Sequence, residues 1–241
     1  LIANRVLQLA LSISLYYVIG INGVILGYAI PLLSLSYLFF SSFKNFSFSF
    51  GEIRTKMRFT MHAYSVAISQ AATNYADKLI IVPIFGFTFL GFYQLGFQFL
   101  MLLSVIPGSL YQYLLPQEAS GVKREVIKKI GLILSVVLAI VSYIMIPYAV
   151  QWFFPQYLEA IPSAQIMIFS IIPLTINSLI NARLLGTEKS KGVFLGSAVY
   201  TTVMITLLYF LGMSFGLIGA AMSMVISLSC QSLVLWMVSK K

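Results

Sequence analysis

A run of polar side chains marks residues 62–78 as the segment of this chain best suited to chemistry. One helical face carries, at intervals of three or four residues, His62, Ser65, Ser69, Thr73 and Asp77, and the adjoining stripe carries Gln70, Asn74 and Lys78. These groups can pair charges, exchange protons and form hydrogen bonds. Polar groups without partners are costly in hydrocarbon. The stripe therefore predicts a helix that faces a protein interior or a water-filled cavity.

The ionisable members of this stripe have two interpretations each. Asp77 is either an ion-coupling or gating carboxylate, with Lys78 contacting a ligand, or the two are a charge pair at the outer interface with Lys78 extending to water. They lie about 100° apart on the helix, so pairing is not automatic. His62, the single histidine, is either a proton-coupling group or a structural residue near the inner end of its span. Asn74 is a further candidate for contact with cargo.

A second group of candidates lies at the inner end of the apolar segment 161–185. The planar guanidinium of Arg183 suits an anionic ligand, although an arginine at this boundary also sets topology. Asn177 and Asn181 are one helical turn apart and deeper. They either contact a ligand or form hydrogen bonds between helices. Pro173 is expected to kink this segment just before the Asn177 turn.

Three further polar residues belong to other apolar segments. Arg5 shares a stripe with Gln8 and either lines a cavity or marks a membrane boundary. Gln94 and Gln98 are one turn apart and are expected to face the interior of a helix bundle. One histidine, one cysteine and scattered carboxylates provide no metal-ligand spacing. No metal and no cofactor are predicted.

The composition identifies the elements that position these residues as membrane helices. Of the 241 residues 60% are hydrophobic and 9% charged, against about half and a quarter in a soluble domain. The apolar runs are long and continuous, which favours helices over a barrel. An all-α transmembrane fold of about eight spans is predicted, over residues 2–19, 22–40, 59–83, 88–115, 130–150, 161–185, 192–212 and 217–238.

The distribution of basic residues predicts the orientation of these spans. With the N-terminus in the cytoplasm, 14 of the 15 basic residues fall on the inner side, and Lys78 is the exception. The predicted location is the cell membrane, multi-pass, with both termini of this chain cytoplasmic. The net charge of +9 is then explained by topology, and no nucleic-acid partner is expected.

Two similar turns suggest an internal repeat. Gly20-Ile-Asn-Gly23 opens the second span, and Gly216-Leu-Ile-Gly219 opens the last, six spans later. This spacing is typical of parallel six-helix repeats. Residues 1–42 would be the final two helices of an N-terminal lobe, residues 43–58 a cytoplasmic connector, and residues 59–241 a complete six-helix C-terminal lobe. The chain, which begins at Leu1, is expected to start inside a longer protein.

Three groups of motifs carry a resemblance to a known family. They are Asn74-Tyr-Ala-Asp77-Lys78-Leu-Ile-Ile with Gly91-Phe-Tyr93-Gln-Leu-Gly96, then Phe154-Pro155-Gln-Tyr157 with Asn181-Ala-Arg183-Leu-Leu-Gly186-Thr-Glu-Lys189-Ser-Lys191, and Gly216-Leu-Ile-Gly219-Ala-Ala221. With these motifs the sequence resembles polysaccharide biosynthesis proteins, the Wzx-type flippases of the multidrug/oligosaccharidyl-lipid/polysaccharide exporter superfamily. The likeness covers most of the chain.

The resemblance implies a MATE-like fold and a transport function. Such proteins move a polyprenyl-pyrophosphate-linked oligosaccharide from the cytoplasmic to the outer leaflet by alternating access of two six-helix lobes. A cationic central cavity takes the anionic headgroup, and the lipid tail stays among the membrane lipids. With this cargo, Arg183 would contact pyrophosphate and Lys78 phosphate or sugar. Asn177 and Asn181 would contact sugar hydroxyls. H⁺ or Na⁺ would be the coupling ion, and polysaccharide-assembly proteins would be partners.

Three other functions compete with this expectation. A MATE-like drug/cation antiporter would favour deep carboxylates, whereas amides, Arg and Lys dominate the candidate cavity residues. A membrane-embedded glycosyltransferase or polymerase needs catalytic acids, usually on a sizeable outer loop, and Glu159 is the only acid of residues 151–160. The chain is therefore not expected to be an enzyme. A non-transporting scaffold of a glycan-assembly complex is the third.

Overall fold

The computed structural model describes residues 2–42, 50–122, 124–187 and 189–240, with side chains for 4–33, 57, 75, 77–122, 124–187 and 189–240. Every element of regular structure in these ranges is helical. Residues 43–49 of the expected connector and the side chains of His62 and Asn74 lie outside the described residues. The expectations for them stay predictions.

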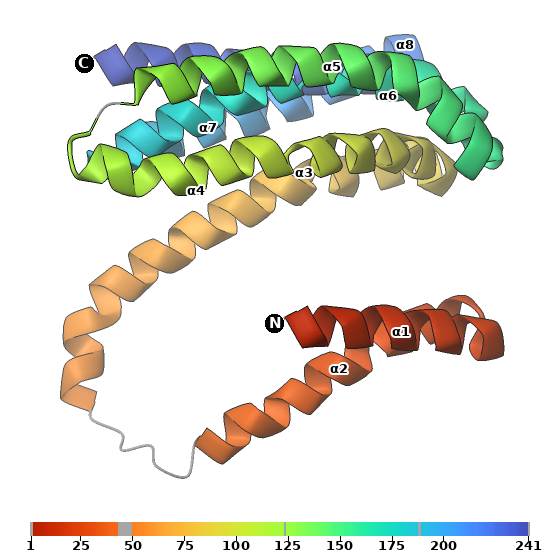
Figure 1. Cartoon of the computed structure of the whole chain (residues 1–241), viewed down its shortest axis with the longest axis horizontal. Helices are drawn as coiled ribbons and strands as arrows, with labels where there is room; N and C mark the ends of the chain where they lie inside the picture. Colours follow the sequence, from red (N-terminus) through yellow and green to blue (C-terminus); the bar gives the residue numbers. More distant parts are fainter. Residues whose placement is uncertain (1, 43–49, 123, 188, 241) are drawn as a thin grey trace. The chain divides into compact units, whose positions relative to one another are not determined.

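The chain forms two compact units, Leu1–Phe59 and Thr60–Lys241. The helices, in chain order, are α1 (Ile2–Ile19), α2 (Ile21–Ser42), α3 (Phe50–Leu103), α4 (Val105–Ala119), α5 (Glu125–Phe153), the 3₁₀ helix η2 (Pro155–Ala160), α6 (Ile161–Ile168), α7 (Ile171–Gly186) and α8 (Ser190–Lys240) (Figure 1). In the second unit α7 contacts α4, α5 and α8, so it is the helix around which the others are arranged. Its buried core is apolar, with Met167, Ile168 and Ile171 fully enclosed near the α6–α7 junction.

Four segments of the described residues are long and apolar enough to cross a membrane. They are Asp77–Leu103, Glu125–Phe153, Pro155–Gly186 and Ser190–Lys240. A hydrocarbon core about 30 Å thick needs about 20 helical residues. The chain is thus compatible with a multi-pass membrane protein. The count of eight spans stays a prediction.

Both of the longest helices double back at a glycine. Gly86 in α3 has φ 82° and Gly216 in α8 has φ 57°, a left-handed conformation that glycine adopts without steric penalty. In α3, the Tyr93 hydroxyl lies 2.9 Å from Asp77, although sixteen residues of straight helix would span about 24 Å. The predicted turns at 84–87 and 213–216 coincide with these two reversals.

The two glycine motifs noted in the sequence share one local geometry. Gly20 has φ 65° and Gly216 has φ 57°. A Cβ atom on Gly23 would overlap the carbonyl oxygen of Leu15, and one on Gly219 would overlap that of Leu211, in each case eight residues earlier. Each motif therefore builds a tight hairpin in which the second glycine allows two helix backbones to touch. Whether the two hairpins are equivalent parts of six-helix repeats stays a prediction.

The contact at Gly219 leads to a stability prediction. We expect Gly219→Ala to destabilise the protein by about 1–3 kcal/mol, because the added methyl must separate the two arms of α8. Gly108→Ala is the matched control, since a Cβ there meets no atom within 4 Å, and it should be neutral or slightly stabilising. Heating the purified protein and measuring the monodisperse fraction by size exclusion tests this. Equal midpoints for the two variants would contradict the assigned contact.

Prolines divide two of the predicted spans. The predicted span 88–115 is interrupted at Ser104, between α3 and α4, and the span 161–185 is interrupted between α6 and α7. Proline lacks the N–H that would bond to the carbonyl four residues earlier. Pro107 and Pro173 follow the two breaks by three residues, and the turn before Pro173 forms tighter bonds such as Ile172 N–H to the Phe169 carbonyl. The kink expected at Pro173 is confirmed.

Candidate functional site

A polar cavity of about 200 Å³ lies within the second unit, between α3, α7 and α8. Half of the residues that line it are polar, namely Asp77, Asn177, Ser178, Asn181, Tyr200 and Gln231. At 1.5 Å per residue, Asp77 is about 14 Å from the Gly86 turn and Met224 about 12 Å from the Gly216 turn. Half of a hydrocarbon core is about 15 Å. If the turns lie at the membrane surface, the cavity is near mid-depth.

Asp77 is held at one side of this cavity by three donors. It is 3% exposed, and its Oδ2 accepts a hydrogen bond of 2.9 Å from the Tyr93 hydroxyl. Its Oδ1 accepts one of 2.8 Å from the Lys78 backbone N–H, and the Lys78 Nζ lies 3.4 Å from the same oxygen. The Lys78 Nζ also lies 3.9 Å from the centre of the Phe97 ring. The two neighbours therefore form a largely enclosed charge pair. The coupling role and the role as a pair at the outer interface both stay predictions.

Asn177 links α7 to α8 at the other side of the cavity. Its Nδ2 donates to the Leu228 carbonyl at 3.2 Å and to the Gln231 Oε1 at 3.0 Å, and its Oδ1 accepts from the Ser232 hydroxyl at 2.7 Å. An amide has two N–H donors, so both are engaged. Of the two expected roles for Asn177, hydrogen bonding between helices is the one that the structure contains.

Asn181 lines the same cavity with an open acceptor. It is one turn after Asn177, and its Oδ1 is buried without a hydrogen-bond partner among the described residues. A buried acceptor without a partner costs about 1–3 kcal/mol. The Oε1 of Gln94 is likewise buried without a hydrogen-bond partner among the described residues, but Gln94 is not among the residues lining the cavity. A buried acceptor without a partner, on a residue that lines a cavity, is typical of a binding group.

Other expected site residues lie elsewhere. Arg183 is exposed in the last turn of α7. Gln98, expected to face the bundle interior, is exposed and lines a separate hollow of about 350 Å³ with apolar neighbours, which corrects that expectation. The reason is that Gln98 is too far around the helix from the buried Tyr93 face. Arg5 lies in the first unit, where its Nη1 is 3.2 Å from Gln8 Oε1 and 3.4 Å from the Tyr28 hydroxyl.

Four residues of the site were not predicted from the sequence. Tyr93 orients Asp77, and the other three line the cavity, namely Ser178, Tyr200 and Gln231. Gln231 carried a readable signal, because it is an amide four residues after Ser227 and eight after Ser223 in an otherwise apolar helix. Tyr93 belonged to a motif noted for its resemblance, but nothing in its spacing related it to Asp77.

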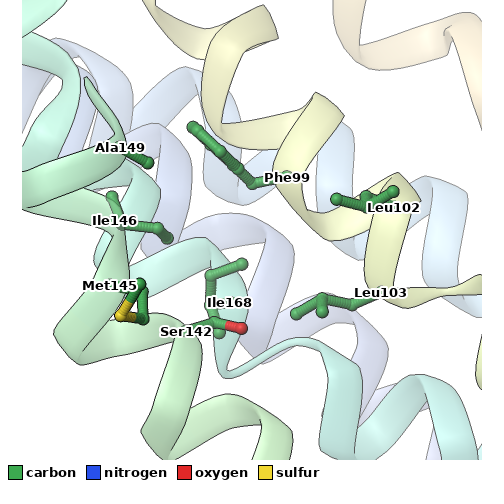
Figure 2. A pocket seen from close by; sticks show the side chains of 8 residues that line it. All are labelled: Phe99, Leu102, Leu103, Ser142, Met145, Ile146, Ala149 and Ile168. Carbon is green, nitrogen blue, oxygen red and sulfur yellow. The ribbon is translucent and has the colours of Figure 1, made fainter. Parts of the chain in front are cut away.

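An apolar hollow lies close to the helix breaks. Figure 2 shows its side chains, which come from the end of α3, from α5 and from Ile168 at the end of α6. It has a volume of about 90 Å³, and Ser142 is the one polar residue among those described around it. Leu103 precedes the Ser104 break, and Ile168 precedes the α6–α7 break. Its lining offers no groups for polar chemistry, so the candidate site is the polar cavity.

Comparison of the chain with protein-family models, with curated proteins and with solved structures finds no match. The class of protein is therefore defined by its own features. It is a helical chain with four segments able to cross a membrane and a polar cavity within its second unit.

Proposed function

We propose that this chain belongs to a membrane transporter that flips polyprenyl-pyrophosphate-linked oligosaccharide from the cytoplasmic to the outer leaflet, for surface polysaccharide biosynthesis. The observation that carries the proposal is the cavity of amides and one carboxylate among membrane-length apolar helices. Polar and ionisable groups at membrane depth are expensive, and they commonly mark the path of a substrate or an ion.

The position of the cavity supports transport over the scaffold alternative. Secondary transporters bind cargo near the bilayer midplane, among helices with interrupted backbones. Here the cavity is about 12–14 Å from two glycine turns, and one of its walls is α7, which follows the break at Pro173. A scaffold needs no polar cavity at this depth. The proposal assigns no enzymatic step to the chain.

The proposed architecture follows the eight predicted spans and a MATE-like arrangement of two lobes. Residues 1–42 would complete one lobe, and residues 59–241 would form the other. The shared geometry of the Gly20 and Gly216 hairpins supports this division. Alternating access would move the two lobes relative to each other, with the cavity inside the second one, in a multi-pass protein of the cell membrane with both ends of this chain in the cytoplasm.

Roles for the charged residues follow from their positions. Arg183, exposed at the end of α7, would meet the anionic pyrophosphate where cargo enters from the cytoplasm, because its planar fork matches phosphate oxygens. Arg5 would act in the same way from the first lobe. Asp77 would couple transport to H⁺. Membrane lipids would hold the polyprenyl tail, and polysaccharide-assembly proteins would be partners.

One observation favours a second candidate function. The sequence argument against a drug/cation antiporter was the near absence of deep carboxylates, yet Asp77 is 3% exposed and lines the cavity. A carboxylate in that position could bind a cationic drug. The pairing of Asp77 with Lys78 at 3.4 Å weakens this alternative, because the pair is close to neutral overall.

Complementation tests the proposed function. We expect the full natural protein to restore surface glycan in a cell that lacks its own oligosaccharide flippase, and Arg183→Ala to lower recovery about 10–100-fold, since a hydrogen bond to a charged group contributes about 1.5–3 kcal/mol. Arg124→Ala is the matched control, an exposed arginine at the start of α5. Recovery is measured by glycan staining at equal membrane expression.

Other results of the same experiment would contradict the proposed function or the role of Arg183. No recovery with an inserted, folded protein would contradict flipping of this cargo. Resistance to cationic dyes in the same cells would then support the antiporter, and absence of both activities would support the scaffold. Equal losses in the two arginine variants would contradict a specific role for Arg183.

A further inference from the structure

We infer that the polar cavity receives an uncharged, hydroxyl-bearing ring of the cargo, of the chemical class of a sugar unit, and that it excludes pyrophosphate. This inference deepens the proposed function and rests on it. It assigns the two parts of the cargo headgroup, the sugar and the pyrophosphate, to different places. The sugar would occupy the cavity between α3, α7 and α8, and the pyrophosphate would stay outside it.

The charges around the cavity exclude a phosphate group. Among the described residues that line it there is no lysine or arginine, whereas the buried Asp77 contributes a carboxylate. The nearest ammonium, that of Lys78, lies 3.4 Å from this carboxylate and against the Phe97 ring. A phosphate in the cavity would meet Asp77 at close range in a medium of low dielectric constant, where repulsion is strong.

The same pair argues against a simple cation. A cation would need negative charge that is not already compensated, and Lys78 compensates Asp77. What remains is a cavity that is polar but close to neutral. Such a cavity favours a ligand that forms hydrogen bonds without carrying charge.

The hydrogen-bonding capacity that remains open includes both acceptors and donors, because the Asn181 Nδ2 and the Gln231 Nε2 donate to no described residue. Both Nδ2 donors of Asn177 are used within the protein, by Leu228 and Gln231. The Asn181 Oδ1 has no partner among the described residues, and each Asp77 oxygen keeps lone pairs beyond its present bonds. Sugar hydroxyls are donors that match such oxygens. The hydroxyl of Ser178 can reciprocate as donor or acceptor.

The size and the apolar half of the lining fit a single ring. The volume of about 200 Å³ far exceeds the ~10–15 Å³ that one water needs, and lies below the ~300–1,000 Å³ of sites for drug-sized ligands. The remaining lining includes Phe97, Leu100 and Met101. A sugar ring has polar edges and apolar C–H faces, so it matches a wall that is mainly apolar and carries several polar groups.

Protection of an introduced thiol tests the inference. Cys230 is the single cysteine of residues 1–241, so Ser178→Cys places one thiol in the cavity wall once Cys230 and every cysteine outside these residues are replaced by serine. The full natural protein is reconstituted in phosphatidylcholine nanodiscs, which contain no sugar, and its alkylation by a maleimide is timed. The probes are a neutral disaccharide, inorganic pyrophosphate, sodium ion and tetraethylammonium.

We expect the disaccharide to slow alkylation in proportion to 1 + [L]/Kd, thus about threefold at twice the Kd, and the other three probes to leave the rate unchanged. Adding Asn181→Leu should abolish the protection without lowering the unprotected rate. Ser120→Cys in the same background is the matched control, because Ser120 is exposed in the turn after α4 and its alkylation should not respond to sugar.

Three results would overturn the inference. Protection by pyrophosphate would show that the cavity accepts phosphate. Protection by sodium or tetraethylammonium alone would make it a cation site. If no probe protects the thiol, in samples of equal monodispersity, the cavity does not bind the sugar unit assigned to it. If sugar protects the thiol but surface glycan does not recover, the ligand class of the cavity is retained and the flippase function is rejected. If surface glycan recovers but sugar gives no protection, the flippase function is retained and this sugar site is rejected.

Discussion

Asp77→Asn is expected to lower gradient-driven transport at least tenfold and to destabilise the protein by about 1–3 kcal/mol. The asparagine can still accept the Tyr93 hydrogen bond of 2.9 Å, but it leaves the partly buried Lys78 ammonium without its carboxylate. Leaving one member of an enclosed pair uncompensated costs more than removing the pair. Transport into membrane vesicles and thermal inactivation of the purified protein measure the two effects separately.

A second variant separates the two roles of Asp77. Asp77→Asn with Lys78→Met removes both charges, so stability should return toward that of the native protein while ion-coupled transport stays low. Glu159→Gln is the matched control, because it neutralises an exposed acid in η2 and should change neither quantity. Full transport by the double variant would mean that Asp77 serves only as the counter-ion of Lys78, and the coupling role would then be rejected.

Asn177→Leu is expected to destabilise the protein by about 2–3 kcal/mol. The change removes three hydrogen bonds between α7 and α8, which average about 0.6 kcal/mol each within membranes, and leaves Gln231 and Ser232 with buried groups to satisfy. The midpoint of thermal unfolding in detergent measures the effect.

Asn181→Leu provides the contrast for Asn177→Leu. The two asparagines are one turn apart on α7, but the Asn181 Oδ1 has no partner among the described residues. Its replacement should therefore leave the unfolding midpoint unchanged or raise it, while it weakens binding in the cavity. Equal destabilisation by the two variants would show that the cavity is held together by both amides, and would contradict the binding role given to Asn181.

The helical class, the long apolar segments and the reversals within α3 and α8 could be predicted from the sequence. These are local properties. A glycine such as Gly86 or Gly216 can take a positive φ whatever surrounds it, and an apolar run of membrane length is readable from its residues. The kink expected at Pro173 was local in the same sense, because the missing N–H belongs to the proline itself. The helix interruption three residues before Pro107 has the same cause and could also have been predicted from the sequence.

Which polar groups meet depends on how the helices pack against one another, and this could not be predicted from the sequence. Spacing along one helix places Asp77 on a face, but the bond to Tyr93 depends on how the two arms of the α3 hairpin are rotated against each other. In the same way Asn177 and Asn181 are equivalent by spacing, and packing against α8 makes one a bridge to Gln231 and leaves the other open. Rotations and offsets between helices arise from the fit of many side chains at once. No single stretch of sequence contains that information, so the cavity became visible only in three dimensions.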